Sequence, residues 1–137
     1  VYSFSTDNSP LFNNEIKALT LDHSSGELFI ATEQGLLGFK STAITASQTF
    51  STLSVYPNPV RENYYGNIAV TGMMFNSEVK ITDANGLLVN TIQSNGGQAV
   101  WNGKNFNSED VQSGVYYFFA TSEDGYSKAK GKVLVVR

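Results

Sequence analysis

Few residues in this sequence have the side chains that catalysis requires. The 137 residues include one histidine, His23, and no cysteine, which excludes disulfide bonds, thiolate metal sites and thiol nucleophiles. A Ser-His-Asp triad would have to use His23, but Asp22 is its immediate neighbour in a turn and is poorly placed to orient the ring. No Gly-x-Ser-x-Gly nucleophile elbow is present. We therefore expect no catalytic residues.

The carboxylates also lack the spacing of a metal or glycosidase site. Asp83-x-Asn85-Gly86 contains part of a calcium-loop pattern, but the distal chelating glutamate is missing, so a hairpin turn is the favoured interpretation. Glu123 and Asp124 are adjacent in a turn, and no separation suited to paired catalytic carboxylates follows from the sequence. We expect no metal ion and no cofactor.

A row of lysines is the strongest candidate for recognition chemistry. Lys128, Lys130 and Lys132 are spaced two residues apart, so a β-strand places them on one face. This row is either a solvated face that discourages pairing with other sheets or a recognition stripe. Exposed aromatic residues can stack on sugar rings, although single exposed aromatics are also ordinary on protein surfaces. The candidates of this second kind are Tyr64, Tyr65 and Tyr126.

These residues must be positioned by an all-β chain of low charge. Hydrophobic residues make up 41% of the sequence, charged residues 15%, and the formal net charge is −3. The apolar content supports a folded core, and the negative charge argues against binding to nucleic acid. No run of 18 apolar residues occurs, so we expect no transmembrane helix.

Short β-branched and aromatic runs recur between Gly-, Asn- and Asp-rich turns, and this pattern is typical of a β-sandwich or barrel. Residues 115–120 are apolar on both faces, which predicts a central strand, and the single Trp101 is expected to fill the core. The expected strands are Val1–Ser5, Ile16–Leu21, Glu27–Thr32, Leu36–Lys40, Leu53–Tyr56, Asn67–Thr71, Glu78–Asp83, Leu87–Gln93, Gln98–Trp101, Val115–Thr121 and Ser127–Val136. The expected inner-face residues are Ile68, Val70, Val79, Ile81, Leu88, Val100, Tyr117 and Val133.

The first part of the chain carries a repeat-like pattern. Residues 14–39 read Asn-x-Ile-x-x-Leu-x-x-Asp, Gly-x-Leu-x-Ile-x-Thr and Gly-Leu-x-x-Phe. This resembles one blade of the two-component-regulator type of β-propeller, with Phe29 at the usual tryptophan position. A generic three-stranded meander is the alternative. One blade cannot bury its faces alone, so we expect a truncated piece of a longer protein whose blade self-associates through its edge. The residues that carry the resemblance are Leu21, Asp22, Gly26, Leu28, Phe29, Ile30, Ala31, Thr32, Gly35, Leu36 and Phe39.

Five motifs follow in order in the second part of the chain. They are Val-Tyr-Pro-Asn-Pro-Val (55–60), Val-Lys-Ile-Thr-Asp-Ala-Asn-Gly (79–86), Trp-Asn-Gly-Lys (101–104), Ser-Gly-Val-Tyr-Tyr (113–117) and Lys-Gly-Lys-Val-Leu-Val-Val-Arg (130–137). This set resembles the C-terminal sorting domain of the type IX (Por) secretion system of Bacteroidota, a small Ig-like β-sandwich. We therefore expect a partial propeller blade at 1–40, a linker at 41–52 and an Ig-like C-terminal sorting domain at 53–137.

The resemblance implies a non-enzymatic region of a β-propeller protein at the cell surface or outer membrane of a Gram-negative bacterium. This region would act as the secretion signal or as an anchoring or interaction domain. The implied partners are the type IX secretion and attachment machinery, and anionic lipopolysaccharide or carbohydrate. In this family the C-terminal end acts as the export signal. The candidate recognition residues are therefore Lys128, Lys130, Lys132 and Arg137.

Two other functions stay open at this point. A periplasmic propeller sensor of a two-component system would continue past Arg137 into a transmembrane helix. A secreted enzyme or adhesin would use the sorting domain only as an address, with its activity upstream. The residues preceding Val1 would separate these possibilities, because further propeller blades favour the surface protein and a catalytic domain favours the secreted enzyme.

Overall fold

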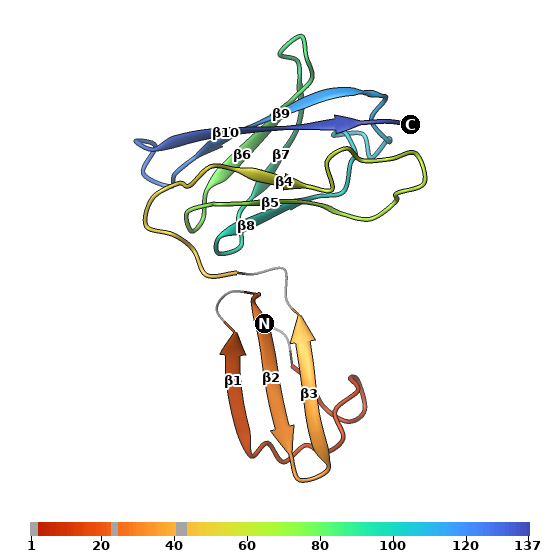
Figure 1. The fold of residues 1–137 in the computed structure, drawn as a ribbon, viewed down its shortest axis with the longest axis vertical. Helices are drawn as coiled ribbons and strands as arrows, with labels where there is room; N and C mark the ends of the chain where they lie inside the picture. The colour runs from red at the N-terminus through yellow and green to blue at the C-terminus, as the bar shows by residue number, and fades with distance from the viewer. Residues whose placement is uncertain (1–2, 23–24, 41–43) are drawn as a thin grey trace. The chain divides into compact units, whose positions relative to one another are not determined.

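The computed structural model describes residues 3–22, 25–40 and 44–137, and this part of the chain is all-β, as expected. Ten strands form three antiparallel sheets (Figure 1). The chain divides into two compact units, Val1–Ile44 and Thr45–Arg137. His23, the one candidate imidazole base, lies outside the described residues. Within the described ranges there is no helix long and apolar enough to cross a bilayer.

The first unit is a single three-stranded meander in the order β1-β2-β3. Cross-strand apolar residues share one face, because Leu19 lies opposite Ile30 and Ile30 lies opposite Leu37. Ile30 is buried there, and the ring centroids of Phe4 and Phe39 lie 4.8 Å apart. The strands are β1 (Ala18–Asp22), β2 (Glu27–Thr32) and β3 (Gly35–Lys40).

The strand expected at Val1–Ser5 is wrong for its described residues, 3–5, which are not in a strand. The backbone N–H of Ser5 donates to Oδ1 of Asn8 (2.7 Å), and the Ser5 carbonyl accepts from the Ser9 hydroxyl (2.6 Å) and from the Ser9 backbone N–H (3.0 Å). Asn and Ser side chains compete with sheet pairing by bonding nearby backbone groups. Here the side chains of Asn8 and Ser9 hold the chain in a turn, although the residue types of Val1–Ser5 favour a strand.

The second unit is a β-sandwich. One sheet has the order β10-β9-β6-β7 and the other has the order β4-β5-β8. Trp101 on β8 is fully buried and contacts the rings of Tyr116 and Phe118 on β9, with centroid separations of 5.5 and 5.7 Å. The indole therefore fills the core, as expected. The strands are β4 (Ser54–Tyr56), β5 (Ile68–Thr71), β6 (Glu78–Thr82), β7 (Leu88–Gln93), β8 (Gln98–Trp101), β9 (Gly114–Thr121) and β10 (Lys128–Val135).

Five of the eight expected inner-face residues are buried, and three are not. The buried ones are Ile68, Val70, Val79, Ile81 and Val133. Val100 and Tyr117 were predicted on the wrong face, because burial alternates along β8 and β9 and the core takes their neighbours instead. On β7, Val89 and Ile92 pack against the core and Leu88 is exposed. In β8 the buried residues are Ala99 and Trp101.

Strand β9 lies between β10 and β6, so the expected central strand is confirmed. One of its faces packs into the core through Phe118 and Ala120. The other face leaves the rings of Tyr117 and Phe119 partly exposed, at 37% and 45%. The predicted central position of this strand is therefore correct, but only one of its two apolar faces is buried.

Residues 45–52 pack with the second unit. Ser47 forms an isolated parallel bridge with Met74, and the backbone N–H of Ser51 donates to the Gly72 carbonyl (3.2 Å). Gly72 has φ +87°, and a Cβ there would lie 2.9 Å from the carbonyl oxygen of Thr52. This stretch belongs to the linker expected at 41–52, of which residues 41–43 lie outside the described residues.

Candidate functional site

The three lysines of β10 lie on one exposed face of the four-stranded sheet. Their alternation with Ala129 and Gly131 turns all three side chains to the same side of the strand. Among the residues that the structure describes, no carboxylate lies within 4 Å of any of these three ammonium groups. Their positive charge is therefore available to a partner.

Two aromatic rings accompany these lysines on the same face. Lys130 lies opposite Phe119 and Lys132 lies opposite Tyr117 in the pairing of β10 with β9. The two rings are stacked, with centroids 6.5 Å apart and planes inclined by 30°. Lys80 lies on the other side of Phe119, on β6, and pairs with Glu78 at 3.3 Å. We call Lys80, Tyr117, Phe119, Lys130 and Lys132 the lysine–aromatic face.

A groove of ≈ 560 Å³ adjoins this face where β4 approaches β10. Gly131 makes the approach possible, because a Cβ at this position would lie 3.2 Å from Cβ of Leu53 and 3.3 Å from Cγ2 of Val55. The groove thus has apolar walls from one sheet and charged walls from the other. Its lining residues are Leu53, Ser54, Val55, Asn58, Tyr117, Lys130, Gly131 and Lys132.

Arg137 does not join the lysine row. Its Nη1 donates to the carbonyl of Tyr64 (3.2 Å), and its Nη2 lies 4.0 Å from Oδ1 of Asp110. Its backbone N–H donates to Oγ of Ser113 (2.8 Å). Because its position has the opposite parity to the lysines, its side chain turns back onto the sandwich and ties this segment down.

The three candidate tyrosines are not equivalent. Tyr64 was expected to be exposed, which is wrong, since it is half-buried, packs against the core and donates its hydroxyl to the Asn67 carbonyl (2.6 Å). Tyr65 and Tyr126 are 84% and 90% exposed. Tyr65 precedes β5 and Tyr126 lies in the β9–β10 turn, and no ring contact joins them among the described residues.

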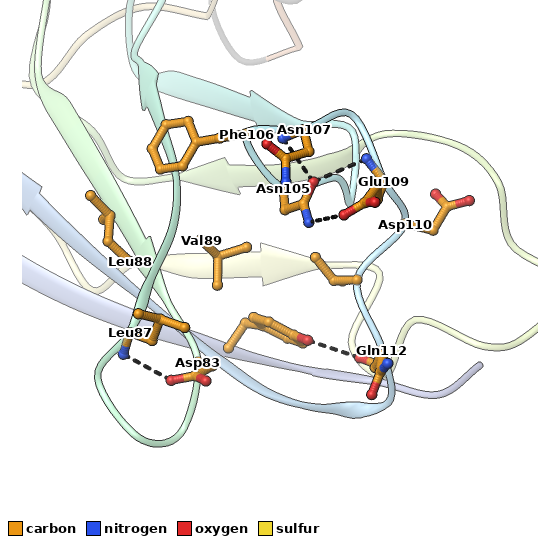
Figure 2. Close-up of a pocket in the computed structure, with 12 residues that line it drawn as sticks. Asp83, Leu87, Leu88, Val89, Asn105, Phe106, Asn107, Glu109, Asp110 and Gln112 are labelled. Atoms are coloured by element: carbon orange, nitrogen blue, oxygen red, sulfur yellow. Dashed lines mark hydrogen bonds between the residues drawn. The ribbon is translucent and has the colours of Figure 1, made fainter.

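A second hollow, of ≈ 470 Å³, lies beside the β6–β7 turn (Figure 2). Oδ1 of Asp83 accepts the backbone N–H groups of Asn85 and Leu87, both at 2.9 Å. The carboxylate therefore holds a hairpin turn, as the sequence favoured. Figure 2 shows the apolar side chains of Leu87, Leu88 and Phe106 around the same hollow.

The opposite wall of this hollow is a self-contained polar loop. Oδ1 of Asn105 accepts the N–H groups of Asn107 (2.9 Å) and Glu109 (3.0 Å), and its Nδ2 donates to Oε2 of Glu109 (2.9 Å) (Figure 2). Burial raises the pKa of Tyr116, and the charge of Asp83 adds to this effect while Arg137 opposes it. The phenol stays neutral and donates to the Gln112 carbonyl (2.9 Å). These polar groups shape the loop.

Sequence spacing found the lysine row, but it missed Tyr117, Phe119 and Lys80 as parts of the same surface. Each lies on a different strand from the row or was assigned to the core. Only the registers of β9 with β10 and of β9 with β6 bring them together. In the described part of the chain, no group of three or more His, Cys, Asp or Glu residues is placed to hold a metal ion.

Comparisons with known proteins agree with this architecture. A search of the curated proteins returned no match. Among solved structures, the chain is similar to PorZ of Porphyromonas gingivalis, described as an essential bacterial surface component of the type IX secretion system. The identity is 30% and the TM-score 0.65, over 100% of this chain and 18% of PorZ. The chain thus spans about a fifth of that relative's length.

Residues 54–136 match the family model described as the secretion system C-terminal sorting domain. The matched range takes in every strand of the sandwich, from β4 to β10, together with the lysine–aromatic face. The family expected from the five sequence motifs is therefore confirmed. The chain belongs to the type IX (Por) secretion system C-terminal sorting domain family.

Proposed function

We propose that this chain is a non-enzymatic C-terminal region of a surface-exposed β-propeller protein of the type IX secretion system. Its sandwich acts as the sorting signal and as an anchoring or interaction domain. The match of residues 54–136 to the sorting-domain family carries this proposal. The similarity to PorZ over the whole chain supports a role in the attachment complex at the outer membrane.

The first unit is, in this proposal, one blade of the propeller. Its three strands follow the order of a blade meander, and Leu19 and Leu36 remain 61% and 66% exposed on opposite faces of the sheet. A repeat unit leaves such surface for its neighbours to cover. The proposed division is a blade at 1–40, a linker at 41–52 and the sorting domain at 53–137.

The lysine row and Arg137 have different proposed roles in recognition. Lys128, Lys130 and Lys132 offer exposed charge to the secretion machinery. Arg137 keeps the end of this segment in place through Tyr64 and Ser113. Anionic lipopolysaccharide or another carbohydrate is a further proposed partner, with Tyr65, Tyr126 or the lysine–aromatic face supplying rings for stacking.

Charge reversal in the native bacterium tests this function. We expect Lys130→Glu/Lys132→Glu to accumulate in the periplasm, because the recognition charge is inverted while the side chains stay exposed. The matched control, Lys40→Glu/Arg61→Glu, makes the same change of charge at exposed residues that belong neither to β10 nor to the groove beside it. Protease accessibility on intact cells measures display. Normal display of the β10 variant would overturn the recognition role of the lysines.

Deletion of residues 132–137 tests the sorting role more directly than the lysine substitutions, because it removes the buried Val133 and Val135 as well as Lys132. A sorting domain that lacks the second half of its last strand should leave the protein in the periplasm. Surface display of this truncated protein at the normal level would contradict the proposed sorting function itself. A secreted enzyme or adhesin fits the family match equally well, and the sequence that precedes residue 1 in the gene distinguishes it, since a catalytic domain there would replace the propeller.

A further inference from the structure

Strand β10 is hydrogen-bonded to another strand on one side only. On its other side, the Asn58 side chain behaves as a short piece of strand. Nδ2 of Asn58 donates to the Lys132 carbonyl (3.2 Å), and the Leu134 N–H donates to Oδ1 of Asn58 (3.1 Å). The Val60 N–H then donates to the Leu134 carbonyl (2.8 Å). The final third of β10 is therefore covered.

These bonds fix the direction of the backbone groups that remain. In an antiparallel ladder, alternate residues turn both N–H and C=O toward the same neighbour. Since Leu134 turns away from β9, Lys128 and Lys130 do the same. In the described part of the chain, no backbone group lies in hydrogen-bonding position to Lys128 or Lys130 on this side. An open edge thus precedes the covered one.

The groove between β4 and β10 lies at this open edge. Lys130 and Lys132 form one side of it, while Leu53 and Val55 form the other. An extended segment placed here would continue the line that Asn58 and Val60 begin. Its alternate side chains would face the ammonium groups and the apolar wall in turn. This is the geometry of recognition by strand addition.

Charge decides which kind of segment fits. A second copy of this chain would bring the same three lysines against the edge, and like charges directly opposite each other in a sheet are destabilising. A segment with Glu or Asp at alternate positions would instead pair with Lys130 and Lys132, which have no carboxylate partner among the described residues. We propose that β10 recruits an extended acidic peptide segment of a partner protein as an additional β-strand.

This inference deepens the proposed recognition by the lysine row and rests on it for the identity of the partner. The test uses the ¹⁵N-labelled chain and the peptide acetyl-Thr-Glu-Val-Glu-Val-Glu-Thr-amide. We expect saturable shifts in the NMR spectrum, slower exchange of the Lys130 amide and cross-strand contacts between the peptide and β10. Absence of saturation, or saturation without protection of this amide, would overturn strand addition.

Two control peptides separate backbone pairing from charge. Methylation of alternate backbone nitrogens removes the donors, so we expect affinity to fall about tenfold for each hydrogen bond lost. Replacing Glu by Lys in the peptide should abolish binding. Equal binding of the methylated peptide would show a purely electrostatic contact, and protection of the Lys130 amide that rises with chain concentration in the absence of peptide would show self-pairing through β10. Either result contradicts the proposal.

Variants of the chain complete the test. Lys130→Glu/Lys132→Glu should weaken peptide binding at least about tenfold, and Lys40→Glu/Arg61→Glu should leave it unchanged. Unchanged binding to the first variant would contradict the charge argument. The outcome is distinct from that of the export experiment, because loss of display with no peptide binding would support the sorting function and reject the acidic strand.

Discussion

The two units of this chain are built from the same kind of strand but differ in what covers their faces. The second unit places a second sheet over the first, and Trp101, Phe118 and Val133 fill the space between them. The first unit has one sheet, and its buried hydrophobic residues are Ile30 on β2 and Leu11 in the segment that precedes β1. Strand formation is therefore local, whereas stability depends on a second layer.

Removing a large side chain from the core of the sandwich should have the largest effect on the difference in stability between the two units. Trp101→Ala removes the ring that contacts Tyr116 and Phe118, and we expect it to lower the free energy of unfolding of the second unit by about 3–5 kcal/mol. Urea unfolding followed by circular dichroism measures this change. Tyr65→Ala is the control, since the ring is exposed. A loss below about 1 kcal/mol would show that Trp101 is not central to the core.

Amide exchange compares the two units directly. We expect the amides of β2 to exchange faster than those of β9 by a factor on the order of a hundred or more, because local opening is easier where few side chains are buried. Exchange measured by NMR at low protein concentration gives both rates in one sample. Equal protection of β2 and β9 would mean that the first unit is as stable as the sandwich.

A higher protein concentration should slow amide exchange in the first unit if the edge of its sheet pairs with another copy of the chain. We expect the first unit to self-associate, because Leu19 and Leu36 are exposed on opposite faces and β1 and β3 are both edge strands. Sedimentation measures the association, and Leu19→Lys/Leu36→Lys should reduce it. A strictly monomeric chain with a well-protected blade would contradict this expectation.

A smaller change tests how closely the two sheets approach at the groove. Gly131→Ala adds a Cβ only 3.2 Å from Leu53, and we expect a cost of about 1–3 kcal/mol from the displaced β4. At Gly114, an added Cβ meets only ordinary contact at 3.8 Å, so Gly114→Ala serves as the matched control. Thermal unfolding of both variants measures the difference. Equal midpoints would show that β4 can shift without cost.

The smallest expected effect concerns pH. The pKa of Asp124 is lowered, first by the hydrogen bond from the Ser122 hydroxyl and then by the Tyr126 N–H. A lowered pKa in the folded state stabilises the fold above the unfolded pKa near 3.8, and this contribution disappears as the pH falls through the folded value. Asp124→Asn should therefore flatten the stability curve slightly below pH 4. An unchanged acid limb would remove Asp124 from this role.

Strand positions could be read from the sequence because alternation and turn residues are local. Glu27–Thr32 and Gln98–Trp101 have the expected bounds. Face assignment failed at Leu88, Val100 and Tyr117, because it depends on which neighbours the core selects. These failures share one cause: the alternation of residues along a strand does not show which of its faces the second sheet covers.

The candidate site likewise has features that local spacing predicts and features that depend on long-range contacts. The spacing of Lys128, Lys130 and Lys132 predicted a shared face, which the strand produces. The contribution of Tyr117 and Phe119, and the separate position of Arg137, depend on strand pairing and on contacts with distant residues. Tyr64 was misassigned because its hydroxyl bonds to a backbone carbonyl that no sequence pattern marks.

The bonds of Asn58 to β10 join residues 74 and 76 positions apart in the chain. Val133 and Val135, which belong to the same strand, are fully buried in the core. Contacts this distant in sequence form late, since the intervening chain must close first. A growing chain that has not yet reached Lys132 leaves the core incomplete and Asn58 unpaired. The sandwich therefore closes only after its final strand has been synthesised. A fully folded sandwich thus indicates that this segment is complete.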